Sequence, residues 1–178
     1  MTGEDDATLL ARIARKDRRA MRALYERHFS SLYGFLRARG ADASLADDVL
    51  QDAMLDVWRQ AGRFRGSSSV RTWLFAIARN KMIDRMRSAG RMTLVAEVPD
   101  TPDEGPDAEA TVAAAQDAQR LRLCVDALPP QQQSAVRLAF FEDLTYDEIG
   151  QVEDIPPGTV KSRIFHAKQS LMRCLGRS

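Results

Sequence analysis

Cysteines and long apolar runs are the scarcest features of this sequence. Its 178 residues include only Cys124 and Cys174, with no CxxC pair and no Cys/His cluster at the spacing of a zinc site. No apolar run approaches the roughly twenty residues that a membrane-spanning helix needs. The acidic start lacks the basic and then apolar pattern of a signal peptide. We therefore expect a cytoplasmic protein without a metal site.

The motifs of common enzymes are also missing. The sequence has no GxxxxGKS/T, HExxH or GxSxG, the patterns that hold phosphate, zinc or a nucleophilic serine. Neither catalysis nor a cofactor is expected. Cys124 continues an apolar stripe with Leu121, Val125 and Leu128, which predicts a buried and unreactive thiol. Cys174, close to the end of the sequence, receives no role.

The net charge of +1 conceals three segments of different sign. Residues 1–95 carry 18 basic and 11 acidic side chains. Residues 96–118 carry seven acidic side chains and no basic one, and residues 119–178 are close to neutral. A basic first part suggests a polyanionic partner, whereas the acidic segment belongs to a different surface.

The acidic segment also marks a boundary. It holds Pro99, Pro102 and Pro106 and few bulky apolar residues, a composition typical of a flexible linker. Everything else reads as helix, and no alternating strand pattern is present. The sequence therefore predicts an all-α protein of two small helical domains, residues 1–94 and 118–178, joined by a flexible acidic linker at 95–117.

Four helical segments are expected in the first domain. The first is short, around residues 9–13. The second shows apolar residues from 21 to 36 at three- and four-residue spacing and stops at Gly40. Ser44 is a plausible N-cap for a third helix that runs to about residue 61. A Gly-bounded loop precedes the fourth, from about 70 to 87, in which Trp73 is expected in the core, and His28 is expected at the edge of the bundle.

The second domain holds the most informative stretch, residues 145–171. Thr145 and Glu148 form a capping box at the start of a short helix, in which Gly150 permits close approach by another helix. Asp154 follows where the chain must turn sharply, and aspartate tolerates left-handed backbone better than most residues. Pro156 and Pro157 then start a second helix.

That second helix has an apolar stripe and a basic outer face. Val160, Ile164, Ala167 and Leu171 form the stripe. The other faces display Thr159, Lys161, Ser162, Arg163, Phe165, His166, Lys168 and Gln169. A solvated helix hairpin is the simpler interpretation. The capping box, small residue, turn and proline start occur in order, however, and this conjunction favours a helix-turn-helix whose second helix enters a DNA major groove.

Two parts of the sequence resemble extracytoplasmic-function (ECF) RNA polymerase sigma factors of the sigma-70 family. Residues 128–168 resemble the family's fourth conserved region, the helix-turn-helix that reads the minus-thirty-five element. Residues 47–52 with Trp58 resemble its core-polymerase-binding helix, and residues 71–84 its promoter-melting helix. The family usually has Leu-Gly where this chain has Glu153-Asp154, and often arginine at His166. The fold is expected to be kept, whereas the resemblance does not give the DNA sequence that is read or its affinity.

The resemblance, together with the residue types, gives three candidate surfaces. The second helix is expected to contact phosphates, base edges and thymine methyl groups of the minus-thirty-five element. The side chains expected to make these contacts are Thr159, Lys161, Ser162, Arg163, Phe165 and His166. Packing at the domain edge is an equally good interpretation of Phe165. A basic ridge with a polar loop suits an unstacked single strand, and the minus-ten set is Phe64, Arg65, Ser67, Arg71, Arg79, Asn80 and Lys81. A flexible surface loop is the alternative there.

The third surface is acidic. It comprises Asp47, Asp48, Gln51 and Asp52. Asp56 continues it, because Asp48, Asp52 and Asp56 follow one another at four-residue spacing. Acidic side chains are favourable near the start of a helix, which explains Asp47 and Asp48 but not Asp52 and Asp56. By resemblance this face binds the clamp of the largest polymerase subunit.

The resemblance implies further partners: the flap of the second largest subunit, promoter DNA and an anti-sigma factor that controls a stress- or signal-responsive regulon. The acidic linker would thread the polymerase channels. A dimeric helix-turn-helix repressor or activator is the main alternative, but it needs a dimerisation surface that nothing here resembles. A pure interaction module, such as an anti-sigma binding protein, would not need the basic face.

Overall fold

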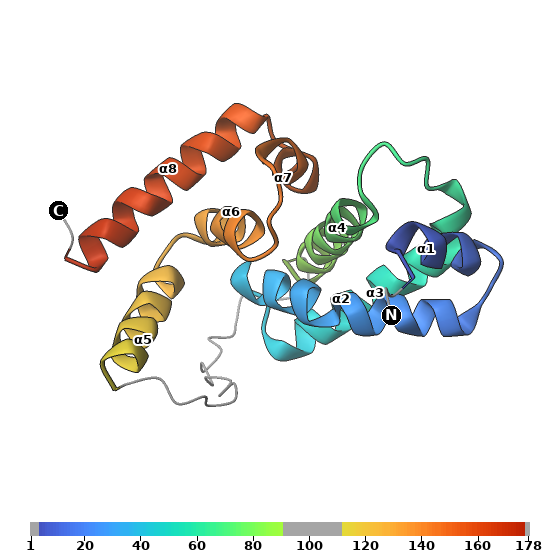
Figure 1. Cartoon of the computed structure of the whole chain (residues 1–178), viewed down its shortest axis with the longest axis horizontal. Helices are drawn as coiled ribbons and strands as arrows, with labels where there is room; N and C mark the ends of the chain where they lie inside the picture. Colours follow the sequence, from blue (N-terminus) through green and yellow to red (C-terminus); the bar gives the residue numbers. More distant parts are fainter. Residues whose placement is uncertain (1–3, 91–111, 177–178) are drawn as a thin grey trace.

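The computed structural model describes residues 4–90 and 112–176 of the chain (Figure 1). Within these ranges it contains eight α-helices, one short 3-10 helix and no strand. The prediction of an all-α fold is confirmed. Residues 95–111 of the predicted linker lie outside the described residues.

The first five elements form a helical bundle. They are α1 (Asp6–Ala14), α2 (Arg18–Ala38), α3 (Ala43–Gln60), the 3-10 helix η1 (Ala61–Arg63) and α4 (Val70–Gly90). An aspartate caps each of the first three helices, because Asp5, Asp17 and Asp42 accept hydrogen bonds from backbone N–H groups of the first turn. Ser44 was the predicted cap of α3. It lies inside the helix instead, and Asp42, two residues earlier, takes the role.

The core of this bundle forms where α2 and α4 meet. Phe35 and Phe75 are fully buried with their rings edge to face at 5.2 Å. Trp73 lies at the margin rather than in the core: it is half-buried, and its ring is 5.2 Å from that of Phe64. His28 is buried rather than at the edge, and its Nε2 atom lies 2.7 Å from the Asp6 carboxylate, which joins α2 to α1.

Four helices follow the linker: α5 (Val112–Asp126), α6 (Pro130–Phe140), α7 (Tyr146–Glu153) and α8 (Pro157–Cys174). Helix α5 therefore begins within the segment assigned to the linker. Val136 of α6 packs with Ala167 of α8 and with Leu128, and Leu171 of α8 lies against them.

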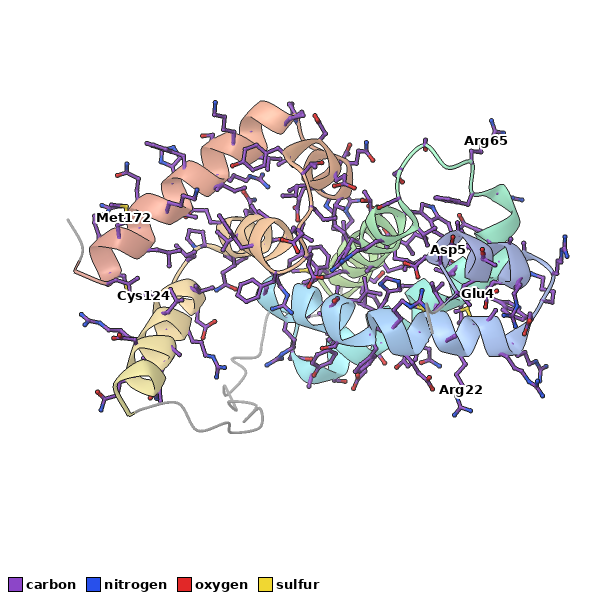
Figure 2. All side chains as sticks on the ribbon, viewed as in Figure 1. Glu4, Asp5, Arg22, Arg65, Cys124 and Met172 are labelled. Carbon is purple, nitrogen blue, oxygen red and sulfur yellow. A yellow bond between two sulfur atoms is a disulfide. The ribbon has the colours of Figure 1, made fainter. Side chains whose placement is uncertain are left out.

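A disulfide joins Cys124 of α5 to Cys174 at the end of α8, with 5.8 Å between the two Cα atoms. Cys124 is buried as predicted (labelled in Figure 2), but it is not a free thiol. Helical spacing reports which face is buried and says nothing of a partner 50 residues away. The prediction of an inert thiol is thus wrong for this structure.

The two helical units pack against each other. Helix α4 lies against α7, and α2 against α6 (Figure 1). Buried apolar residues of both units belong to one continuous cluster, in which Leu144, Ile149 and Val152 of the second unit take part.

Candidate nucleic-acid interface

The start of the helix-turn-helix is built as the sequence predicts. The Oγ1 atom of Thr145 accepts from the Glu148 backbone N–H at 3.2 Å, and the Glu148 carboxylate accepts from the Thr145 backbone N–H at 2.9 Å. This capping box fixes the first turn of α7. The hydrogen bond from the Thr145 backbone also lowers the pKa of the Glu148 carboxyl.

The turn that follows is tight. Asp154 has φ 54° and ψ 49°, the left-handed conformation expected of it. A Cβ atom on Gly150 would lie 2.7 Å from the backbone oxygen of Ile155. The close approach predicted at Gly150 is confirmed: the nearest neighbour is the backbone of the turn, and Pro157 at the start of α8 follows at 3.6 Å.

Helix α8 buries Val160, Ile164 and Ala167, as predicted. Five of its six candidate DNA-binding side chains are exposed: Thr159, Lys161, Ser162, Phe165 and His166. Phe165 is 56% exposed, and its ring lies edge to face with that of His166. This exposure argues against packing at the domain edge.

Arg163 is the exception. Its side chain is 20% exposed, and its Nη1 atom lies 3.8 Å from the carboxylate of Glu153 in α7. Arg163 was predicted on the outer face, but a buried carboxylate from the preceding helix draws it inward.

The minus-ten candidates divide between loop and helix. In the loop before α4, Arg65 and Ser67 are exposed, and Arg65 projects from its outer edge (Figure 2). Phe64 is half-buried against Trp73.

On α4 itself, three of the four candidates are paired with carboxylates. Arg71 pairs with Glu142, Arg79 lies 3.9 Å from Glu153, and Lys81 lies 2.6 Å from Asp56 of α3. Asn80 is exposed. The sequence pattern identified this basic ridge but not the acidic groups that face it.

The acidic surface of α3 also divides in two. Asp48 and Asp52 point toward α4, where their carboxylates lie 3.3 Å and 2.7 Å from Arg85. The hydrogen bond from Arg85 lowers the pKa of Asp52. Asp56 forms an ion pair with Lys81, so each of the three aspartates at 48, 52 and 56 has a basic partner on α4. The sequence pattern did not offer this explanation of their spacing.

Asp47 and Gln51 face the other way. They line a shallow pocket between α2 and α3 whose walls are largely apolar. Its other lining residues are Arg18, Met21, Tyr25, Leu50, Met54, Leu55 and Trp58. Tyr25 and Leu55 are exposed, although each is large and apolar. Sequence reasoning missed them because Tyr25 recurs at the spacing of the core stripe of its helix, whereas Leu55 falls outside such a stripe and belongs to no motif.

Comparison with known proteins decides between a sigma factor and a dimeric regulator. The Sigma-70 region 2 model matches residues 24–92, and the Sigma-70 region 4 model matches residues 118–171. The ECF RNA polymerase sigma factor RpoE of Cereibacter sphaeroides is 36% identical over 92% of this chain and 93% of that protein. The chain belongs to the ECF sigma factors. The RNA polymerase sigma-H factor of Pseudomonas aeruginosa is 30% identical over 98% of this chain and 96% of its own.

Two solved structures share the fold of this sigma factor. One is CnrH in complex with the cytosolic domain of CnrY, at a TM-score of 0.66 and 24% identity over 96% of this chain and 97% of that one. The other is the sigma factor RpoE with the anti-sigma factor NepR from Bartonella quintana, at a TM-score of 0.68 and 22% identity over 87% and 96%.

The family models map onto the structure unit by unit. Region 2 covers α3, α4 and much of α2, and region 4 covers most of α5 to α8. A sigma factor is a transcription initiation factor, not an enzyme. No helix within the described ranges is long and apolar enough to cross a membrane. Nor do residues 4–90 and 112–176 hold a group of three or more side chains suited to a metal ion.

Proposed function

We propose that this ECF sigma factor directs RNA polymerase core to promoters through three surfaces, each on a separate part of the chain. The exposed face of α8 reads the minus-thirty-five element. The loop before α4 and the α4 ridge bind and open the minus-ten element. The pocket between α2 and α3 docks on core polymerase.

The observation that carries the minus-thirty-five assignment is the exposed face of α8. Thr159, Lys161, Ser162, Phe165 and His166 are all exposed, and neither Lys161 nor His166 forms an ion pair with another described residue. Lys161 supplies charge for a phosphate, whereas Ser162, His166 and Phe165 supply hydrogen bonds and apolar contact for base edges. Such a set combines affinity with sequence discrimination on one helix.

Core docking centres on Asp47 and Gln51 rather than on the whole acidic face. Asp48 and Asp52 already have Arg85 as an intramolecular partner. Asp47 and Gln51 instead border exposed apolar surface at Leu55 and Tyr25. A mostly apolar patch with a polar edge is typical of a protein interface. The partner is the clamp of the largest subunit, and region 4 meets the flap of the second largest.

The regulation of this sigma factor is inferred from its family. A sigma factor of this fold binds an anti-sigma factor, and we place a partner of that kind here, acting on a stress- or signal-responsive regulon in the cytoplasm. The acidic linker passes through the polymerase channels, where its seven carboxylates meet basic surface.

Run-off transcription with purified core, this protein and a promoter library tests the proposal. We expect core-dependent starts at defined sequences, since one small helix-turn-helix binds DNA alone at only about 10⁻⁴ to 10⁻⁶ M, and core links two weak contacts. Leu55→Asp should abolish the starts while the free protein still binds DNA. Arg59→Ala, an exposed change on the same helix, should leave them intact. Tight promoter binding without core and no starts with core would contradict the proposal.

A further inference from the structure

Glu153 is a carboxylate buried between the two helical units. It is 3% exposed, and it accepts hydrogen bonds from Arg39, the residue that follows α2, at 2.7 and 2.6 Å. Ser134 of α6 donates a third at 2.6 Å. Arg39 belongs to region 2 and Glu153 to region 4, so this ion pair ties the two regions directly.

Two further carboxylates of region 4 make similar contacts. Glu142, 4% exposed, pairs with Arg71 at the start of α4. Glu148 accepts from the hydroxyl of Thr72 at 3.3 Å. The ridge of α4 therefore faces a row of acidic groups on and before α7, as it would face the phosphates of a DNA strand.

The buried charge of Glu153 requires partners, and this requirement favours the packed arrangement of the two units. A carboxylate removed from water is stable only while cations and donors compensate it. Arg39 and Arg79 supply this compensation from region 2, and Ser134 and Arg163 supply it from region 4. When the units separate, water replaces the lost partners, so Glu153 stabilises the packed arrangement through its region 2 partners, of which Arg39 is the nearest.

We propose that Glu153 and Arg39 form a latch that holds the free sigma factor closed, with region 4 covering the DNA-binding ridge of region 2. This inference rests on the proposed DNA-binding roles of Arg71 and Arg79. In the closed arrangement Arg71 pairs with Glu142, and Arg79 lies near Glu153. The free chain is thereby kept from binding DNA with both regions until core polymerase holds them apart.

The closed arrangement has a free-energy cost that makes it easier to open. The Nε atoms of Arg71 and Arg137 are buried without a hydrogen-bond partner among the described residues. Each unpaired donor costs free energy on closing. A closed state with such costs is displaced readily by a partner that binds the open one.

The test compares two substitutions in the full-length protein, Glu153→Gln and Arg39→Gln, with Asp147→Asn as the control. Asp147 is exposed on the same helix as Glu153. Small-angle scattering measures the radius of gyration, and fluorescence anisotropy measures binding to a labelled duplex without core. Loss of a charged hydrogen bond should lower the closed-to-open ratio by on the order of tenfold. Both variants should expand and bind the duplex several-fold more tightly, and the control should match the wild type.

Arg39→Gln is the decisive variant because its two effects have opposite signs. Losing a positive charge weakens DNA binding by simple electrostatics, whereas opening the latch strengthens it. Tighter binding by Arg39→Gln supports the latch. Unchanged scattering, or weaker DNA binding by Arg39→Gln, overturns the proposal.

Two controls separate this result from other failures. Helix content by circular dichroism must equal that of the wild type, so that an expanded variant is an opened one and not an unfolded one. Run-off transcription with core judges the proposed function by itself. An absence of starts in the wild type would defeat that function, whereas scattering would still decide whether Arg39 and Glu153 hold the two units together.

Discussion

Helices α4 and α8 are both proposed to bind DNA, yet they are held in place by different means. Basic side chains of α4 pair with carboxylates: Arg71 with Glu142, Lys81 with Asp56, and Arg85 with Asp48 and Asp52. The outer face of α8 has no such pairing among the described residues. Its two ends are fixed instead, by a tight turn at the start and a disulfide at the finish.

This difference separates binding from stability. On α8 the side chains available for DNA have no part in holding the helix, so a substitution there should change binding alone. On α4 the same side chains also join helices, so a substitution should change both. Four experiments test this contrast, in order of expected effect.

Breaking the disulfide should have the largest effect. Closing a loop of 50 residues limits the unfolded chain and contributes up to about 4 kcal/mol in the chain-entropy model. Cys124→Ser should therefore lower the stability of region 4, and Cys174→Ser should do the same. Both tryptophans lie in the first bundle, so tryptophan fluorescence reports region 2, while circular dichroism reports both units. Urea unfolding should shift more by circular dichroism than by fluorescence.

A reductant supplies the control, because it should reproduce the shift in the wild type and add nothing in Cys124→Ser. Disulfides are uncommon in the reducing cytoplasm, so the reduced protein is also the one to compare in transcription. Equal stability with and without reductant would contradict the assigned role of the bond.

Disturbing the turn should come second. Alanine at Gly150 places a Cβ atom 2.7 Å from the Ile155 oxygen, a backbone atom that cannot move alone. Overpacking of this kind costs about 1–3 kcal/mol. Gly150→Ala should lower the urea midpoint and weaken minus-thirty-five binding together, because α8 shifts relative to α7. Gly158→Ala, where a Cβ atom meets no neighbour, should lower neither, because alanine at an unstrained helical position stabilises.

Apart from the cap of α3, where Asp42 takes the role expected of Ser44, the sequence predicted what is local and left out what depends on distant contacts. The capping box at Thr145, the left-handed Asp154 and the apolar stripe of α8 are set by neighbours within a few residues, and all were found. The inward turn of Arg163 depends on a carboxylate that packing buries. The Cys124–Cys174 bond and the pairing of Asp52 with Arg85 join residues far apart in sequence, and periodicity carries no information about such pairs.

The third experiment compares two lysines, one on each helix. Lys161→Ala should lower the slope of DNA binding against salt by about one and leave the unfolding midpoint unchanged, since an isolated surface substitution is nearly neutral. Lys81→Ala removes the partner of Asp56 at 2.6 Å and should cost about 0.2–1 kcal/mol of stability as well. His166→Ala should instead change the preferred base. Equal losses of stability for both lysines would remove the distinction between the helices.

The smallest effect is expected at the pair of Asp52 and Arg85, where pH provides the test. The hydrogen bond from Arg85 lowers the pKa of Asp52 in the folded chain. A lowered carboxyl pKa contributes stability above the unfolded value of about 3.9, and that contribution is lost as pH falls through the folded pKa. Asp52→Asn should therefore reduce the urea midpoint slightly at pH 7, and the gap to the wild type should close below about pH 4. Asp84→Asn, an exposed change on α4, serves as the matched control. A gap that persisted in acid would assign the loss to packing around residue 52, and the ion pairs would no longer explain how α4 is held against α3.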